Sequence, residues 1–185
     1  MKYDSFKHHR RSIRLKGYDY SSLGAYFVTI YTNNRANIFG DIVDGKMILN
    51  KFGEIVKKIW FDLPNHFTNV QLDEFIVMLN HVHMIIFIIN DDHRHRRGLA
   101  CQTPTKRTFG KPISCSLPTI IGSFKSAVTK HINRIRKMSG FPVWQRNYYE
   151  HIIRDEDELN AIRQYIIYNP QNWDIDMENP DFRKL

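Results

Sequence analysis

The chain lacks the features that mark membrane, secreted or disulfide-stabilised proteins. No apolar stretch approaches the roughly 20 residues that a membrane-spanning helix needs, because the longest, Met84 to Ile89, has only the length of a strand. The first residues are polar and basic, without the apolar core of a signal peptide. Cys101 and Cys115 are too few for a disulfide framework and too far apart for a close-spaced zinc motif. We therefore expect a cytoplasmic protein that does not enter a membrane.

Acidic residues are also in deficit, since 19 Asp and Glu against 27 Lys and Arg give a net charge of +8. The basic residues gather in four segments, over residues 7–16, 93–97, 106–111 and 125–137. Local clusters of this kind suit a phosphate backbone, and the aromatic residues between them suit stacking on unpaired bases. Solvated basic faces above a core of aromatic side chains would give the same composition. The charge therefore favours a nucleic-acid partner without requiring one.

A length of 185 residues predicts one main domain. We expect a basic N-terminal arm over residues 1–20, the domain over residues 21–175 and a C-terminal tail over residues 176–185. Residues 90–117 are rich in Arg, Thr, Pro, Ser and Gly and too long for an ordinary connection. This segment is therefore either mobile or functional.

The pattern of apolar residues predicts a mixture of strands and helices. Strands are expected over residues 25–32 and as a pair over residues 70–89, with a bulge or turn at Leu79-Asn80. Asp44-Gly45 predicts the turn of a small hairpin. Helices are predicted from Asn50 to Leu63 with Pro64 as the stop, from Pro118 to Met138, and from Glu156 to Tyr168 after a cap at Asp155.

The most informative motif is the pair His81 and His83 within the apolar run from Phe75 to Ile89. Side chains alternate along a strand, so positions two apart project from the same face. Two imidazoles on one face can hold a divalent metal ion, with neighbouring groups fixing their second nitrogens. Two histidines with other hydrogen-bond partners near a strand end would give the same pattern. The motif by itself leaves both interpretations open.

A tyrosine and an asparagine four residues apart lie at the end of the last predicted helix. Tyr165 and Asn169 fall on one helix face and offer a phenolic oxygen and an amide oxygen. Two histidines and one amide would bind Mg or Mn and leave positions open for a phosphate oxygen. Attack by the tyrosine would then give a covalent phosphotyrosine and a free 3′-hydroxyl. Alternatively, Tyr165 belongs to the buried face of this helix, and Asn169-Pro170 only marks where the helix ends.

Four motifs in this order resemble those of the REP-associated tyrosine transposases, which belong to the single-tyrosine HUH transposases. The motifs are Leu79-Asn-His-Val-His83, Trp144-Gln-Arg146, Tyr149-Glu-His-Ile-Ile-Arg-Asp155 and Tyr165-Ile-Ile-Tyr-Asn-Pro170. The resemblance covers about residues 23–173. It implies an α+β fold, namely a ferredoxin-like α/β sandwich whose central antiparallel sheet carries helices on one or both faces. Leu79 stands where the family often has proline, which bears on the local backbone only.

The resemblance also implies the roles of the site residues. His81 and His83 would bind the metal, Asn169 would supply a third, polar ligand, and Tyr165 would be the nucleophile. The implied substrate is single-stranded DNA with imperfect hairpins formed by repeated extragenic palindromes. We therefore expect a metal-dependent single-stranded DNA endonuclease and strand transferase that uses Mg or Mn and acts as a monomer or homodimer.

Basic residues outside the catalytic motifs are the expected DNA contacts. Charge and helical placement predict that four of them touch phosphates: Lys125, Lys130, Arg134 and Arg146. The arm would hold the hairpin or its flanking bases through three more: Arg10, Arg11 and Arg14. Two other functions are compatible with the same residues, a repeat-hairpin binding protein that does not cleave and a metal-dependent hydrolase that uses water. A Tyr165→Phe variant distinguishes all three.

Overall fold

The computed structural model describes residues 18–90, 113–176 and 179. Nearly all of the predicted arm lies outside these residues, and with it Arg10, Arg11 and Arg14. The same holds for most of the segment 90–117 and of the tail. No helix in the described part of the chain is long and apolar enough to cross a lipid bilayer.

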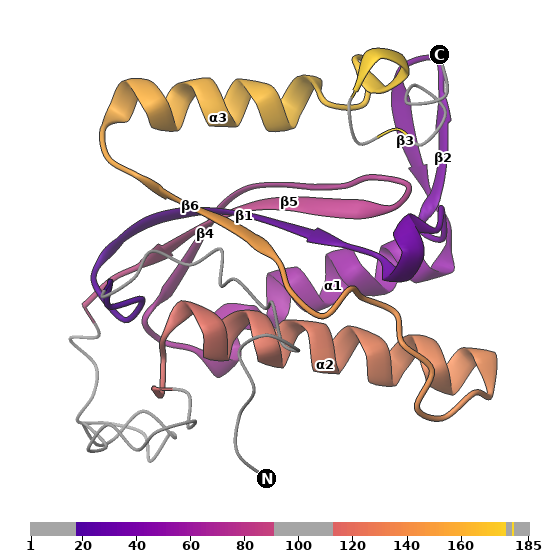
Figure 1. The fold of residues 1–185 in the computed structure, drawn as a ribbon, viewed down its shortest axis with the longest axis horizontal. Helices are drawn as coiled ribbons and strands as arrows, with labels where there is room; N and C mark the ends of the chain where they lie inside the picture. Colours follow the sequence, from indigo (N-terminus) through magenta and orange to yellow (C-terminus); the bar gives the residue numbers. More distant parts are fainter. Residues whose placement is uncertain (1–17, 91–112, 177–178, 180–185) are drawn as a thin grey trace, which may run out of the picture.

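Four antiparallel strands form the central sheet in the order β4-β5-β1-β6 (Figure 1). The strands are β1 (Gly24–Tyr31), β4 (Val70–Val77), β5 (His81–Ile88) and β6 (Tyr149–Ile153). Helix α1 (Lys51–His66) joins β1 to β4, and α2 (Leu117–Arg136) lies between β5 and β6. The resulting βαββαβ order with an antiparallel sheet is the ferredoxin-like arrangement. The predicted fold class is therefore confirmed.

Helices cover both faces of this sheet. Figure 1 shows α1 and α2 on one face and α3 (Glu156–Tyr168) across the other. Alternate residues of β1 and β5, such as Val28 and Met84, belong to the main core beneath α1 and α2. The residues between them, such as Phe27 and Ile85, pack under α3. Strand alternation thus divides the sheet into a core face and an α3 face.

Helix α1 begins where the sequence predicts and ends later. The Asn50 side chain accepts hydrogen bonds from the backbone N–H groups of Phe52 and Gly53 at 2.8 and 3.2 Å, as an N-cap does. The predicted stop at Pro64 is wrong, because the helix continues through it to His66. Proline lacks the N–H that would bond the carbonyl oxygen of Trp60, but the chain after it still bonds back into the helix, with the Phe67 N–H donating to the Leu63 carbonyl oxygen at 2.9 Å.

The other two helices follow their predicted positions. Helix α2 ends at Arg136 rather than Met138, because Lys137 adopts a left-handed backbone with a φ of 55° and turns the chain back. Helix α3 has the predicted bounds, and the Asp155 side chain caps it by accepting from the Glu158 N–H at 2.8 Å.

A small hairpin supports the turn that precedes β5. It consists of β2 (Gly40–Val43) and β3 (Lys46–Leu49), with the predicted turn at Asp44 and Gly45, both of which have positive φ angles. The short helix η1 (Asn33–Arg35) lies between β1 and β2, and the short helix η2 (Trp173–Ile175) follows α3. Trp173 packs with the turn residues Met78 and Leu79, and two hairpin side chains join this cluster. The β4–β5 turn is therefore held from outside the sheet.

Candidate catalytic site

His81 and His83 lie side by side on the α3 face of β5, as strand alternation predicts. Their Nε2 atoms are 2.9 Å apart, and both side chains are buried. The turn predicted at Leu79-Asn80 joins β4 to β5, and the Met78 N–H donates to the His81 carbonyl oxygen across it at 2.8 Å. The two imidazoles therefore sit at the start of a strand whose position is fixed by this turn.

The second nitrogen of each ring also has a partner. His81 Nδ1 is 2.7 Å from Asn80 Oδ1, and His83 Nδ1 is 2.8 Å from Thr29 Oγ1. An amide oxygen only accepts, so Nδ1 of His81 carries the proton and its Nε2 is an acceptor. His83 Nε2 then donates to His81, and His83 Nδ1 accepts from the Thr29 hydroxyl. One pair of neutral tautomers thus satisfies the four nitrogens.

Burial keeps His81 neutral. It lowers the pKa of His81 to about 3 from the ordinary 6.5, and the positive charge of Arg35 acts in the same direction. The rings of Tyr31 and Trp173 enclose the imidazole, with centroids 5.7 and 6.0 Å away. A neutral imidazole is the form that binds a metal ion. At neutral pH, His81 therefore presents an unprotonated Nε2.

Tyr165 reaches the histidine pair from α3. Its Oη lies 3.3 Å from His83 Nε2, although the two residues are 82 positions apart in the chain. The side chain is 45% exposed, so the phenol touches the buried pair and also meets solvent. Phe27 stacks on His83 and meets the Tyr165 ring edge-on, with centroids 5.4 and 6.2 Å away. A phenol at this place is accessible to a large substrate.

An ion pair fixes the helix that carries Tyr165. The Arg163 guanidinium donates two hydrogen bonds to Asp73 on β4, at 2.6 and 2.9 Å. The same contact holds the pKa of Asp73 below its usual range. Because both side chains are largely shielded from solvent, this bidentate pair is stronger than an exposed one.

Asn169 lies at the C-terminal end of α3 and is buried. Its Nδ2 donates to Asp176 Oδ2 at 3.0 Å. Its Oδ1 is shielded from solvent and has no hydrogen-bond partner within the described part of the chain. Such an oxygen costs roughly 1–3 kcal/mol unless something binds it. Asp176 is a site residue that the sequence analysis missed, since nothing in the pattern indicated that η2 would bring it back to α3.

The donor set fits a divalent metal ion. Octahedral Mg²⁺ holds its ligands at about 2.0–2.1 Å, which places neighbouring ligands about 2.9 Å apart. The two Nε2 atoms have this separation, 2.9 Å, and His83 would bind through Nε2 once its proton is on Nδ1, where the Thr29 hydroxyl oxygen can accept it. Two imidazoles favour a transition ion and an amide oxygen a hard one, so Mn²⁺ satisfies both preferences better than Mg²⁺. In residues 18–90 and 113–176, no group of three or more His, Cys, Asp or Glu could hold a metal ion.

Strand β6 is connected to α3 through His151. His151 Nε2 and Glu158 Oε1 are 2.7 Å apart, and the other oxygen of Glu158 accepts from the Arg154 N–H at 2.8 Å. These contacts join β6 to α3. Tyr148 is buried, whereas Tyr149 is 48% exposed on the α3 face with its ring 6.3 Å from that of Phe27.

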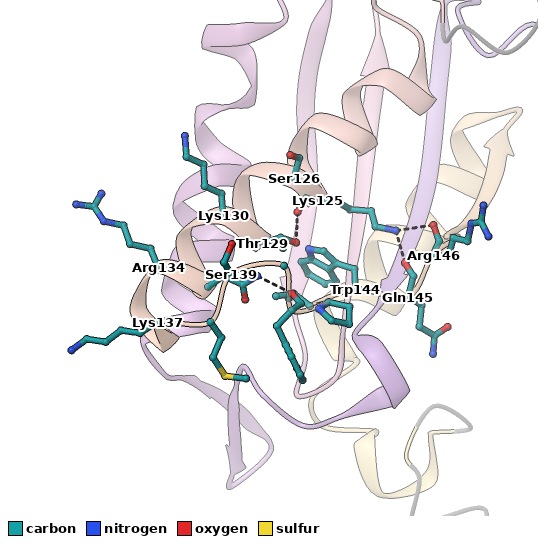
Figure 2. A pocket seen from close by; sticks show the side chains of 16 residues that line it. Lys125, Ser126, Thr129, Lys130, Arg134, Lys137, Ser139, Trp144, Gln145 and Arg146 are labelled. Carbon is teal, nitrogen blue, oxygen red and sulfur yellow. Dashed lines mark hydrogen bonds between the residues drawn. The ribbon is translucent and has the colours of Figure 1, made fainter.

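The predicted phosphate contacts that the structure describes lie beside α2, on the core side of the sheet (Figures 1 and 2). They line a groove of about 790 Å³ between α2 and the chain that follows it. Lys130, Arg134 and Arg146 are exposed there. Lys125 differs, because its Nζ donates to three backbone carbonyl oxygens of residues 145–147 at 2.6, 3.2 and 3.3 Å. Burial lowers the pKa of Lys125 to about 8. Its contact with a phosphate stays a prediction.

The fold of the chain matches that of a solved structure. A solved structure of a REP-associated tyrosine transposase bound to a REP hairpin matches it with a TM-score of 0.51 and 15% sequence identity, over 88% of this chain and 74% of the other. The chain therefore has the fold of a REP-associated tyrosine transposase.

Sequence comparison narrows the relationship. An uncharacterized protein of Haemophilus influenzae is 43% identical over 175 residues, which cover 95% of this chain and 96% of that protein. The chain belongs to the same family as this protein. The "Putative REP-associated tyrosine transposase" of the same organism is 26% identical over 153 residues, or 82% of this chain and 73% of the relative. No family model matches the chain. The resemblance inferred from the four motifs is thus confirmed in fold and in sequence.

Proposed function

We propose that the protein is a metal-dependent single-stranded DNA endonuclease and strand transferase that recognises hairpin repeat DNA. The observation that carries this proposal is the approach of Tyr165 Oη to within 3.3 Å of His83 Nε2, beside a second buried histidine. The structural neighbour that binds a REP hairpin supports the class of substrate. Cleavage, the metal and the nucleophile are parts of the proposal.

His81, His83 and Asn169 Oδ1 would hold Mg²⁺ or Mn²⁺. Such an ion, when bound, polarises a phosphodiester and stabilises the charge that builds up on its oxygens. Tyr165 Oη gives up its proton to water and attacks the phosphorus, the bond to the 3′ oxygen breaks, and that oxygen takes up a proton from water and leaves as a 3′-hydroxyl. The DNA stays attached to Tyr165 through its 5′ phosphate. A second 3′-hydroxyl can reverse the step, which makes the protein a strand transferase.

An adduct assay tests the proposal. Single-stranded hairpin DNA labelled on the 3′ side of the cleavage site is incubated with the protein and Mn²⁺, and the products are separated on a denaturing protein gel. A labelled protein band that chelator abolishes is the expected result. Cleaved DNA without a labelled band would mean that water is the nucleophile. Tight binding with neither product would favour a repeat-hairpin binding protein. Cytoplasmic location and a monomeric or homodimeric state stay predictions.

Asp176 determines which atom of the Asn169 amide is free. A carboxylate can only accept, so it holds Nδ2 and leaves Oδ1 to face the other way. We expect Asp176→Ala to weaken Mn²⁺ binding by roughly 10- to 100-fold, as loss of an outer-shell partner does. Titration of the metal-free protein followed by electron paramagnetic resonance measures this. The exposed Asp174→Ala is the matched control, and an equal loss in both variants would contradict the assignment.

A further inference from the structure

The groove beside α2 is held open by two internal contacts, one at each end. Asn133 Nδ2 donates to the Phe141 carbonyl oxygen at 2.8 Å. Lys125 Nζ holds the carbonyl oxygens of residues 145–147 at the other end. Figure 2 shows the returning chain and α2 as the two walls, with the Lys125 contacts as dashed lines. Because its walls are tied together, we treat this α2 groove as a preformed site (lined by Lys125, Lys130, Arg134, Lys137, Phe141 and Arg146 among others).

The groove carries positive charge alone. No Asp or Glu lines it. In the sequence, residues 93–149 contain 12 of the 27 basic residues and none of the 19 acidic ones. Within the described residues, no ion pair involves Lys130, Arg134, Lys137 or Arg146. No carboxylate of the described residues therefore neutralises these exposed cations, and such a surface attracts a polyanion.

The spacing of the cations fits one nucleic-acid strand. Lys130 and Arg134 lie one turn apart on α2, Lys137 is the capping residue just after the helix, and all three line the groove over a span of about 10 Å. Phosphates recur about every 3.4 Å of axial rise along one strand of a duplex, so this span covers about three of them. Phe141 and Met138 lie beside the cations and are 45% and 47% exposed. An exposed aromatic ring next to a basic track is typical of sites that stack unpaired bases.

We propose that the α2 groove binds single-stranded DNA, with phosphates on Lys130, Arg134 and Lys137 and an unpaired base on Phe141. This rests on the proposed function and extends it. The hollow of about 790 Å³ is in the size range of a small-molecule pocket, which is large enough for unpaired bases. Figure 1 shows α2, which forms one wall of the groove, and α3, which carries Tyr165, on opposite faces of the sheet. The strand bound here is therefore a flanking segment away from the scissile phosphate.

Binding of labelled oligothymidylate, followed by fluorescence anisotropy in a Tyr165→Phe background, tests the proposal. We expect Lys130→Glu/Arg134→Glu/Lys137→Glu to weaken binding at least tenfold. The slope of log affinity against log salt should fall by about 2, because each lost contact removes about 0.7. The matched control, Lys51→Glu/Lys57→Glu/Lys58→Glu, changes three exposed lysines of α1 by the same charge. Equal weakening by both triple variants would overturn the proposal.

The aromatic contact is tested separately. Phe141→Ala should weaken binding at least fivefold, whereas Phe61→Ala, which removes an exposed ring from α1, should not. Iododeoxyuridine in the oligonucleotide should crosslink to Phe141. A duplex that binds with the same dependence on the groove would overturn the choice of a single strand. The adduct assay on wild-type protein is independent of these measurements, so failure of cleavage and failure of the groove are distinguished.

Discussion

Tyr165→Phe is expected to lower formation of the protein–DNA adduct by a factor of at least about 10³, since in the proposed mechanism Tyr165 supplies the nucleophilic oxygen. Phenylalanine keeps the ring that packs against Phe27 and His83 and loses only the oxygen 3.3 Å from His83 Nε2. Affinity for hairpin DNA should stay within a factor of about two, as expected for a change at an exposed atom. Adduct gels and anisotropy on the same preparation measure the two quantities.

Two other tyrosines serve as controls for this variant. Tyr168 is 47% exposed near the end of the same helix, and Tyr149 is 48% exposed on the same face of the sheet. Changing either to phenylalanine should leave the adduct in place. An adduct that persists in Tyr165→Phe and disappears in Tyr168→Phe would move the nucleophile by one helix turn. Cleavage that persists without any adduct would establish water as the nucleophile.

Acid is expected to destabilise the metal-free protein through His81. Its pKa is about 3 in the folded state and 6.5 ordinarily. Below pH 6.5 the unfolded chain therefore binds a proton that the folded chain does not. The free energy of unfolding falls as the pH drops from about 6.5 towards 3, by up to 1.36 kcal/mol per pH unit and roughly 4–5 kcal/mol over the window.

Urea denaturation in the presence of chelator measures this effect between pH 7 and 4. Asp73 and Glu158 also have lowered pKa values, so their stabilising contacts are lost in acid as well. The test is therefore the difference between wild type and His81→Gln, which removes one titrating group. The slope of the free energy of unfolding against pH should be smaller in the variant than in wild type, by the contribution of about one titrating proton. Parallel stability curves for the two proteins would show that His81 does not titrate in this range.

The parts of the site that depend on one strand or one helix could be predicted from the sequence. His81 and His83 share a face because strand side chains alternate, and Asp155 caps α3 because its side chain reaches the N–H three residues on. The same local rules predict the Asp44-Gly45 turn and most helix bounds. A rule that ends a helix at proline fails at Pro64, because the N–H of Phe67 beyond it still bonds back to Leu63 and the helix runs on to His66.

Contacts between distant segments could not be predicted in this way. Nothing local brings Tyr165 to His83, and only the resemblance of the motifs connected them. Lys125 was selected for its charge, yet its ammonium reaches carbonyl oxygens 20 to 22 residues away. Asp176 meets Asn169 because η2 turns the chain back after Pro170. Such contacts depend on how elements pack, and charge or spacing in the sequence does not specify packing.

The alternation of β5 has a consequence for how genes of this family can change. The strand supplies the histidine pair from one face and the core residues Val82, Met84 and Ile86 from the other. A single codon inserted or deleted in the turn over residues 78–80 would exchange the two faces. The imidazoles would then face the core, and the core side chains would face α3. One insertion or deletion would therefore disrupt both the fold and the candidate site. Length variation among descendants should therefore accumulate in other connections and spare this one.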